Sequence, residues 1–222
     1  MSSVLDYLSN IPSYFLTSLA LMILVGIILF FVGKKVEKLN PTDRPSKFIV
    51  IFISFVKFFN NFIKGYVGKQ WKWLSPLILT LATYVFVSNI SGMFALDSPT
   101  KYTAITFSLS IFAFLIIQIT GLISSKWKHF LSIFKPIPVM MPLNLIGEIT
   151  PIISIALRLF GNLISGTVFI VLIYRFTGWL SVIIAPAFHL IFDLGFGFIQ
   201  ALVYVLLTVI FTSSKIDDKD FV

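Results

Sequence analysis

The sequence predicts an all-α membrane protein with five membrane helices and one interfacial amphipathic helix, the last two membrane helices being long, tilted and paired in an antiparallel hairpin. Three observations predict this fold class. Hydrophobic residues make up 58% of the 222-residue chain and charged residues only 12%, unlike the composition of soluble domains. Apolar runs long enough to cross a hydrocarbon core of about 30 Å recur along the chain. Basic residues gather in alternate connections, as on the cytoplasmic side of membrane proteins.

Residue usage excludes several classes of function. The formal charge of +8 fits a cytoplasmic excess of Lys and Arg better than a nucleic-acid partner. The chain has no cysteine and only two histidines, which excludes thiolate metal sites and argues against a dedicated metal centre. It also has no Gly-rich phosphate loop and no nucleophile motif, so we expect no cofactor and no catalytic chemistry on this chain. Without repeats or linkers, residues 1–222 are predicted to form a single membrane domain with no removable signal peptide.

The first apolar run, residues 14–32, predicts the first membrane span. The basic segment after it predicts a cytoplasmic loop, and therefore an N-terminus outside. Residues 48–66 are apolar but place Lys57, Asn61 and Lys64 at i, i+4 and i+7 on one helical face. This pattern predicts an amphipathic helix in the cytoplasmic interface. The alternative, a poor second span, would place Lys57 in hydrocarbon and invert every later loop.

Residues 73–96 and 102–123 predict a pair of spans joined by a tight external turn. Two longer apolar runs follow, 139–176 and 179–213. Each would measure roughly 50 Å or more as a helix, so both must tilt in the bilayer. The turn between them is short, which predicts an antiparallel hairpin. In this topology all of the 17 Lys and Arg residues lie on the cytoplasmic side except Lys101, Arg158 and Arg175, which supports a cytoplasmic C-terminus.

A small set of polar residues interrupts the two long runs. Arg158 is the only charged residue in the range 149–173, and an arginine at the centre of a membrane helix costs about 2.5–3.5 kcal/mol on insertion scales. The rise per residue of a helix predicts Asp193 nearer the external turn than Arg158, Gln200 at about the level of the arginine, and Glu148 near the cytoplasmic end. We therefore expect one carboxylate on each side of the arginine.

Helical spacing gathers these residues into one polar seam on each helix. Arg158 and Asn162 share a face, and so do Asp193 and Gln200, with His189 one turn before Asp193. Such seams predict two aqueous half-routes separated by a fixed positive charge, because arginine stays protonated in proteins. Simpler roles stay open: Arg158 could pair with Asp193 and lock the hairpin, His189 could bond a backbone carbonyl, Asn162 and Gln200 could join the helices, and Glu148 could face cytoplasmic water.

The segment ALRLFGN, residues 156–162, resembles the signature around the essential arginine of subunit a of F-type ATP synthases. The segment FIQALVYVLLT, residues 198–208, is similar to the last helix of that family. The order of the spans, the Ser-Pro-Thr turn at 98–100 and the tilted hairpin extend the resemblance over nearly the whole chain. Pro142 and Glu148, which precede the arginine, look like the bacterial form.

The resemblance implies a stator subunit of the Fo sector, which faces a rotating ring of c subunits and assembles with a b-subunit peripheral stalk and the rest of the ATP synthase. Arg158 would match the arginine that draws the ring carboxylate into its deprotonated form. Many relatives pair an acid with a histidine at the positions of Thr167 and Asp193. Thr167 cannot ionise, so Asp193 is expected to carry the outer relay, assisted by His189. The resemblance also assigns Asn162 and Gln200 to the outer half-channel and Glu148 to the inner one.

We therefore expect a multi-pass protein of the bacterial plasma membrane that carries protons, with the mitochondrial inner membrane as the alternative location. The choice between protons and sodium ions is made mainly at the ring, on another chain. A rival hypothesis is a secondary transporter that binds an anionic solute at Arg158. Internal repeats or broken half-helices in matching places would favour it, and neither is evident. A structural scaffold would leave Arg158, Asp193 and Glu148 without a purpose.

Overall fold

The computed structural model describes residues 12–37, 46–94, 96, 98–125 and 141–216, and every element within these ranges is helical. The α-helices are α2 (Ser13–Glu37), α3 (Lys47–Val67), α4 (Trp71–Ile90), α5 (Thr103–Ser125), α7 (Met141–Thr177), α8 (Ser181–His189) and α9 (Phe196–Ser213). Short 3₁₀ turns connect or extend them: η1 (Gly68–Gln70), η2 (Ser91–Phe94), η3 (Pro99–Lys101) and η5 (Gly178–Leu180). A π-helix, η6 (Leu190–Gly195), joins α8 to α9.

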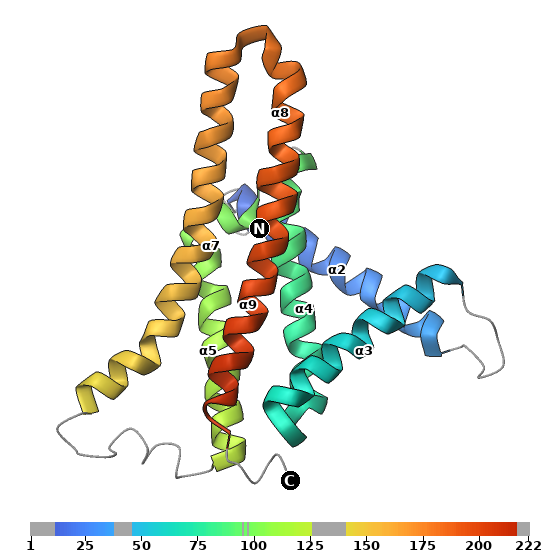
Figure 1. Ribbon diagram of the computed structural model, residues 1–222, viewed down its shortest axis with the longest axis vertical. Coiled ribbons are helices and arrows are strands. Elements are labelled where there is room, and N and C mark those ends of the chain that lie inside the picture. The colour runs from blue at the N-terminus through green and yellow to red at the C-terminus, as the bar shows by residue number, and fades with distance from the viewer. Residues whose placement is uncertain (1–11, 38–45, 95, 97, 126–140, 217–222) are drawn as a thin grey trace, which may run out of the picture.

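The molecule is organised around a long hairpin made by α7 on one side and α8, η6 and α9 on the other (Figure 1). The turn of this hairpin rises above the other helices, and α4 and α5 lie beside its lower half. Helix α4 packs on α9, α5 packs on both α7 and α9, and α2 and α3 pack on α4. The lower part of α7 leans outward in Figure 1. Pro151 lies inside this part of the helix, where a proline removes a backbone hydrogen bond.

Two glycines with positive φ mark the points where long helical stretches change direction. Gly68 (φ 57°) ends α3, and Gly178 (φ 51°) follows α7. Other residues rarely adopt this backbone conformation. Four helical stretches in the described parts of the chain are long and apolar enough to cross a membrane: Ser13–Glu37, Lys47–Phe94, Thr103–Ser124 and Met141–Ser213. The two glycines divide the second stretch into α3 and α4, and the fourth into the two sides of the hairpin.

Two clusters of buried side chains hold the helices together. The first cluster joins α2, α4, α5, α7 and α9 and contains Leu21, Tyr84, Val85, Leu109, Ala113, Ile155, Leu159, Ala201 and Tyr204. The second joins α3, α4, α5 and α9 and contains Phe59, Ile63, Val67, Leu74, Ile78, Ile116, Val205 and Val209. Several hydroxyls find partners within the bundle: the Tyr204 hydroxyl donates to the Leu109 carbonyl (3.0 Å), and Ser18 and Tyr84 share a hydrogen bond of 2.6 Å. In an apolar environment an unpaired polar group is costly.

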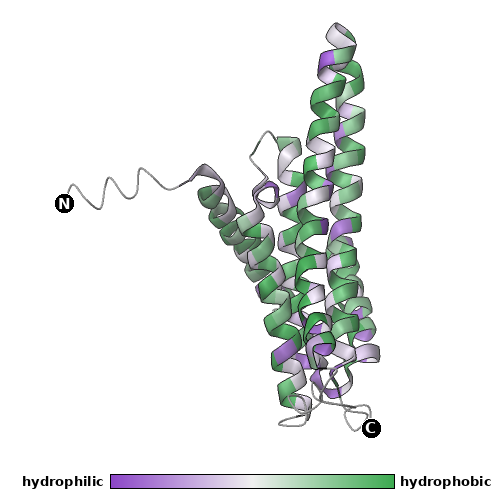
Figure 2. Cartoon of the chain, turned by 90° about the vertical axis from the view of Figure 1, so that its left-hand side faces the viewer, coloured by the Kyte–Doolittle hydropathy of each residue, from purple (hydrophilic) through white to green (hydrophobic). Residues whose placement is uncertain are grey.

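The outer surface of the helices is strongly apolar. Large side chains such as Phe31, Phe58 and Val182 are 67%, 71% and 77% exposed. Figure 2 shows hydrophobic residues along most of the long helices, with hydrophilic residues gathered toward the lower end. A water-soluble protein rarely leaves so much apolar surface uncovered. Such a surface is typical of an all-α membrane protein.

Several helix boundaries differ from those expected from the apolar runs. Helix α2 continues past residue 32 to Glu37, and α4 ends at Ile90, short of residue 96, because the chain tightens into η2. Lys34 and Lys35 lie in the last turn of α2, where positive charges interact favourably with the helix dipole. The helix therefore extends beyond the end of the apolar run. The basic loops predicted within 38–45 and 126–140 lie outside the described residues, as does the lead at 1–11.

Candidate functional site

Arg158 lies on the outward face of α7. Its neighbour Leu159 is 1% exposed and belongs to the core, whereas Leu157 is 55% exposed and Arg158 itself is exposed. The ion pairs between described residues join His189 to Asp193 and Lys215 to Glu148. Among the described residues, none hydrogen-bonds or pairs with the Arg158 guanidinium, so the hairpin is not locked by an Arg158–Asp193 pair. The arginine therefore presents its donors to the outside, beside exposed apolar side chains such as Leu157.

Asn162 follows Arg158 by one helical turn and connects α7 to α9. Its side-chain amide donates a hydrogen bond of 2.8 Å to the Gln200 side-chain oxygen. Gln200 is buried (4% exposed), while Asn162 is exposed on the same face as Arg158. This contact places Gln200 close to the level of the arginine, as the helical rise predicted. The pair joins the two helices, and it also places polar groups beside the arginine.

Asp193 lies in the π-helix η6, and its Oδ2 is 2.7 Å from the His189 Nδ1. His189 thus pairs with a side chain, and the alternative of a bond from this nitrogen to a backbone carbonyl is wrong. Both side chains are only partly exposed, at 29% and 14% for the histidine and the aspartate. π-Helical turns are rare and occur often at functional sites. The Thr167 hydroxyl does not take part in this pair: it donates a hydrogen bond to the Leu163 carbonyl of its own helix (2.8 Å).

A close approach between η2 and the hairpin brings further polar groups to Asp193. A Cβ atom added at Gly92 would lie 3.1 Å from the Ser98 Oγ and 3.5 Å from the Asp193 Oδ2. A side chain at this position would press on the Ser98 hydroxyl, which would have to shift by a few tenths of an ångström. The Ser91 hydroxyl lies 3.2 Å from the Ser98 hydroxyl and donates to the Ser88 carbonyl. The Asp193 carboxylate and the Ser98 hydroxyl therefore both lie close to Gly92 of η2.

A narrow cleft links the amide pair to the carboxylate. Its polar lining comes from four elements: Asn89 of α4, Asn162 of α7, Asp193 of η6 and Gln200 of α9. The cleft measures about 10 Å³, which is room for about one water molecule. Asn89 is itself held in place, because its side-chain oxygen accepts a hydrogen bond of 2.8 Å from the Thr100 hydroxyl. Four polar side chains from four elements thus lie around one small space.

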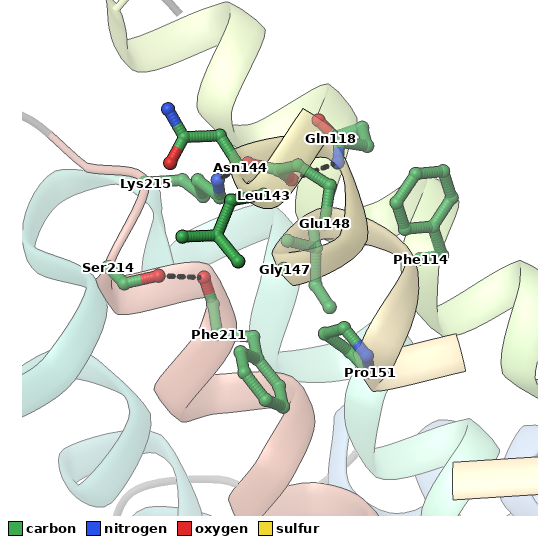
Figure 3. Close-up of a pocket in the computed structure, with 11 residues that line it drawn as sticks. Phe114, Gln118, Leu143, Asn144, Gly147, Glu148, Pro151, Phe211, Ser214 and Lys215 are labelled. Atoms are coloured by element: carbon green, nitrogen blue, oxygen red, sulfur yellow. Dashed lines mark hydrogen bonds and ion pairs between the residues drawn. The ribbon is translucent and has the colours of Figure 1, made fainter. Parts of the chain in front are cut away.

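Glu148 faces a second and larger cavity at the other end of the hairpin (Figure 3). This cavity measures about 390 Å³ and is lined by Phe114, Ile117, Gln118, Leu143, Asn144, Gly147, Glu148, Pro151, Phe211, Ser214 and Lys215. The Gln118 side-chain amide donates to the Glu148 Oε2 (2.8 Å), and the Lys215 ammonium donates to Oε1. The glutamate side chain is 14% exposed. It is thus held by partners and does not extend freely into water.

The described residues bring no group of three or more His, Asp or Glu side chains together. The two side-chain pairs at these sites are the His189 imidazole with Asp193 and the Lys215 ammonium with Glu148. Each offers a single carboxylate together with a cation or an imidazole.

The sequence analysis missed four residues that the structure places at these two sites: Asn89, Ser98, Gln118 and Lys215. The sequence did contain a signal for two of them, Asn89 and Gln118. Asn89 and Gln118 each interrupt an apolar run, and the criterion that singled out Arg158 applies equally to a buried amide. Ser98 and Lys215 carried no such signal, because each lies at the end of a helix or in a turn, where polar residues are ordinary.

Comparison with known proteins assigns the chain to a family. The family model described as ATP synthase A chain matches residues 15–213. ATP synthase subunit a of Mycoplasmoides gallisepticum is 30% identical over 97% of this chain and 82% of its own length. That of a Sulfurihydrogenibium species is 27% identical, over 90% of this chain and 94% of its own length. The subunit a of Propionigenium modestum, described as sodium ion specific, is 28% identical over 80% of this chain and 66% of its own length.

The family match covers the helices that carry Arg158, the Asn162–Gln200 pair, the His189–Asp193 pair and Glu148. These relatives are bacterial, and the apolar helical bundle is that of a membrane protein. The resemblance inferred from the sequence is therefore confirmed: the chain belongs to the ATP synthase A chain family, the bacterial subunit a of the F-type enzyme.

Proposed function

We propose that this chain is the proton-translocating stator subunit of a bacterial ATP synthase, in which Arg158 faces the carboxylate of a c-subunit ring. One observation carries the proposal: the arginine lies on an exposed apolar face, with no partner among the described residues. A lipid-facing guanidinium would be costly. A carboxylate brought by a neighbouring chain offsets this cost, and a rotating ring brings a new carboxylate at each step.

The outer half-channel uses the residues around the narrow cleft. A proton reaches the Asp193 carboxylate, which the His189 imidazole holds in place at 2.7 Å. From there the cleft leads toward the Asn162–Gln200 pair, one helical turn from the arginine. Amide and hydroxyl groups can each orient a water molecule, so they can pass a proton along without ionising themselves. The route ends at the ring carboxylate, which accepts the proton.

Arg158 separates this outer half-channel from the inner one. Arginine remains protonated in proteins, so it cannot relay a proton directly across the membrane. Its charge stabilises the ring carboxylate in the deprotonated form, which favours release of a proton toward Glu148 and the inner cavity. Each proton that moves down a potential of 100 mV releases about 2.3 kcal/mol. This free energy drives rotation of the ring, and the chemistry of ATP synthesis takes place on other chains.

The predicted topology forms part of this proposal. Helices α2, α4, α5 and the two sides of the hairpin would be the five spans of a single membrane domain in the bacterial plasma membrane. The N-terminus would lie outside and the C-terminus in the cytoplasm. Helix α3 would lie in the cytoplasmic interface. It has a buried face that includes Phe59, Ile63 and Val67, and exposed apolar and polar faces on its other sides.

Labelling of introduced cysteines tests the placement of α3. Lys57 and Phe58 are adjacent and both exposed, with Phe58 71% exposed, but they point about 100° apart on the helix. We expect a Lys57→Cys variant to react with a membrane-impermeant maleimide added on the cytoplasmic side, since that face would be in water. The Phe58→Cys variant is the matched control and should stay unlabelled, because its face would be in lipid. The chain has no native cysteine, so each label reports one position.

Equal labelling of the two cysteines from the cytoplasmic side would contradict an interfacial helix. So would labelling of Lys57→Cys only from the opposite side, which would instead support the inverted topology with α3 as a span. Reactivity of both variants after the membrane is dissolved in detergent shows that the two thiols are competent to react.

Purification from native membranes tests the assignment of partners. A tagged copy of this chain is expected to bring down a small membrane ring whose subunit carries one carboxylate at mid-membrane, the b-subunit stalk and a soluble ATPase head. An anionic-solute transporter would purify without these chains. Recovery of the tagged chain alone, from membranes in which the ATPase head is abundant, would overturn the proposed function.

A further inference from the structure

Lys215 follows the C-terminal end of α9, and its side chain reaches into the cavity that contains Glu148 (Figure 3). The cavity thus draws on three segments that are distant in sequence: Gln118 comes from α5, Glu148 from α7 and Lys215 from the end of α9. The Lys215 side chain is only 20% exposed. Its ammonium is therefore turned inward, although a lysine at a helix end could extend into solvent.

Lys215 and Gln118 each donate a hydrogen bond to a different oxygen of the Glu148 carboxylate. Lys215 donates to Oε1 and Gln118 donates to Oε2. Both are charge-assisted hydrogen bonds, because the acceptor is a carboxylate, and the bond from Lys215 adds the attraction between opposite charges. A carboxylate held at both oxygens is restricted to one orientation, whereas Gln118 alone would leave the other oxygen without this donor. Lys215 is thus the stronger of the two restraints.

The packing of α7 does not depend on this ion pair. Near Glu148, the Ser110 hydroxyl of α5 donates to the Ile152 carbonyl of α7. Pro151, Ile155 and Leu159 are buried, and the last two belong to the larger apolar cluster. These contacts hold α7 on α5 whether or not Lys215 is present. Loss of the Lys215 ammonium should therefore change the orientation of the Glu148 carboxylate more than the packing of α7 on α5.

We propose that Lys215 is a positioning residue of the inner half-channel, which orients the Glu148 carboxylate toward the cavity through which protons leave. This inference rests on the proposed function. The ammonium holds one carboxylate oxygen, and the Gln118 amide holds the other. The cavity of about 390 Å³ beside them has room for several waters. Protons from the ring cross this water past a carboxylate whose position is fixed.

A double-mutant cycle on the complete ATP synthase tests the assignment. Lys215→Met, Glu148→Gln and the double variant are compared in membrane vesicles stripped of the ATPase head, and the passive proton flux is measured per assembled ring. We expect Lys215→Met to lower the flux by up to about tenfold, the equivalent of one lost charge-assisted hydrogen bond. In the Glu148→Gln background the same change should have no further effect, because the carboxylate it acts on is gone.

Two further variants separate positioning from a general effect of charge or fold. Lys215→Arg should restore most of the flux, because it keeps a cation at the same place. Lys69→Met removes an exposed lysine of η1 that does not line the cavity, and should leave the flux at the wild-type level. Wild-type flux in Lys215→Met, or an equal loss in both glutamate backgrounds, would overturn the inference. If the proposed function itself fails, the wild-type vesicles will conduct no protons and no ring will copurify.

Discussion

An Arg158→Ala variant is expected to assemble into the complex and to pump no protons when ATP is added. The arginine is exposed and has no partner among the described residues, so its removal breaks no contact within the described bundle. Removing a charge from a membrane helix should even favour insertion, by about 2.5–3.5 kcal/mol. The variant should lose pumping because nothing would then stabilise the deprotonated ring carboxylate between the two half-channels. The measurement is quenching of a pH-sensitive dye in inverted vesicles, in sodium-free buffer.

Arg175→Ala provides the matched control for this experiment. Arg175 is also exposed and also belongs to α7, but it lies in the last turn of the helix, near the hairpin tip. Its replacement should leave ATP-driven pumping unchanged, which separates the effect of position from that of losing one positive charge. Normal pumping by assembled Arg158→Ala complexes would refute the role given to the arginine. A failure of both variants to assemble would show that the two arginines act in folding.

An Asp193→Asn variant is expected to slow passive proton flux at least about tenfold, on the scale of losing a positioned proton carrier. Asparagine keeps the shape of the side chain and can still bond His189, so the π-helix and the cleft should persist. A neutral amide cannot accept and release a proton. The flux is measured in vesicles stripped of the ATPase head, where the membrane sector alone limits it.

Thr167→Ala is the comparison that tests which residue carries the outer relay. The Thr167 hydroxyl is engaged by the Leu163 carbonyl of its own helix, so its removal should change the flux by no more than about twofold, as for an ordinary surface substitution. Equal effects of the two substitutions would contradict the relay through Asp193. A His189→Ala variant should fall between them, because it frees the carboxylate without neutralising it.

Much of the architecture followed from apolar runs and their lengths. A run of about 20 apolar residues must form a helix in lipid, because no other local structure satisfies its backbone groups internally. The hairpin was predictable because its two runs are too long for one crossing and the turn between them is short. Arg158 stood out for a similar reason: a charge in such a run is expensive, so its presence alone indicated a functional role. Helical spacing then predicted that Gln200 would lie near the arginine, and the Asn162–Gln200 hydrogen bond agrees with this.

Other features depended on contacts between distant segments. The π-turn at Leu190–Gly195 changes the spacing of side chains around Asp193, and no hydrophobic pattern encodes such a turn. The close approach of Gly92 to Asp193, and the meeting of Gln118 and Lys215 at Glu148, join residues from different helices. The hydropathy of a segment and the periodicity of its polar residues describe a single helix. They therefore do not predict which polar side chains from different helices will line the same cavity.

A membrane bundle with a long final hairpin and an arginine within an apolar run could therefore be predicted from the sequence, because each of these follows from what lipid permits. The packing of the helices was needed to show that the arginine is exposed, without a partner among the described residues, while Asp193 and Glu148 are each held by another side chain. The reason is geometric. A helix fixes the relative directions of its own side chains, but its rotation about its axis is set by the neighbours against which it packs.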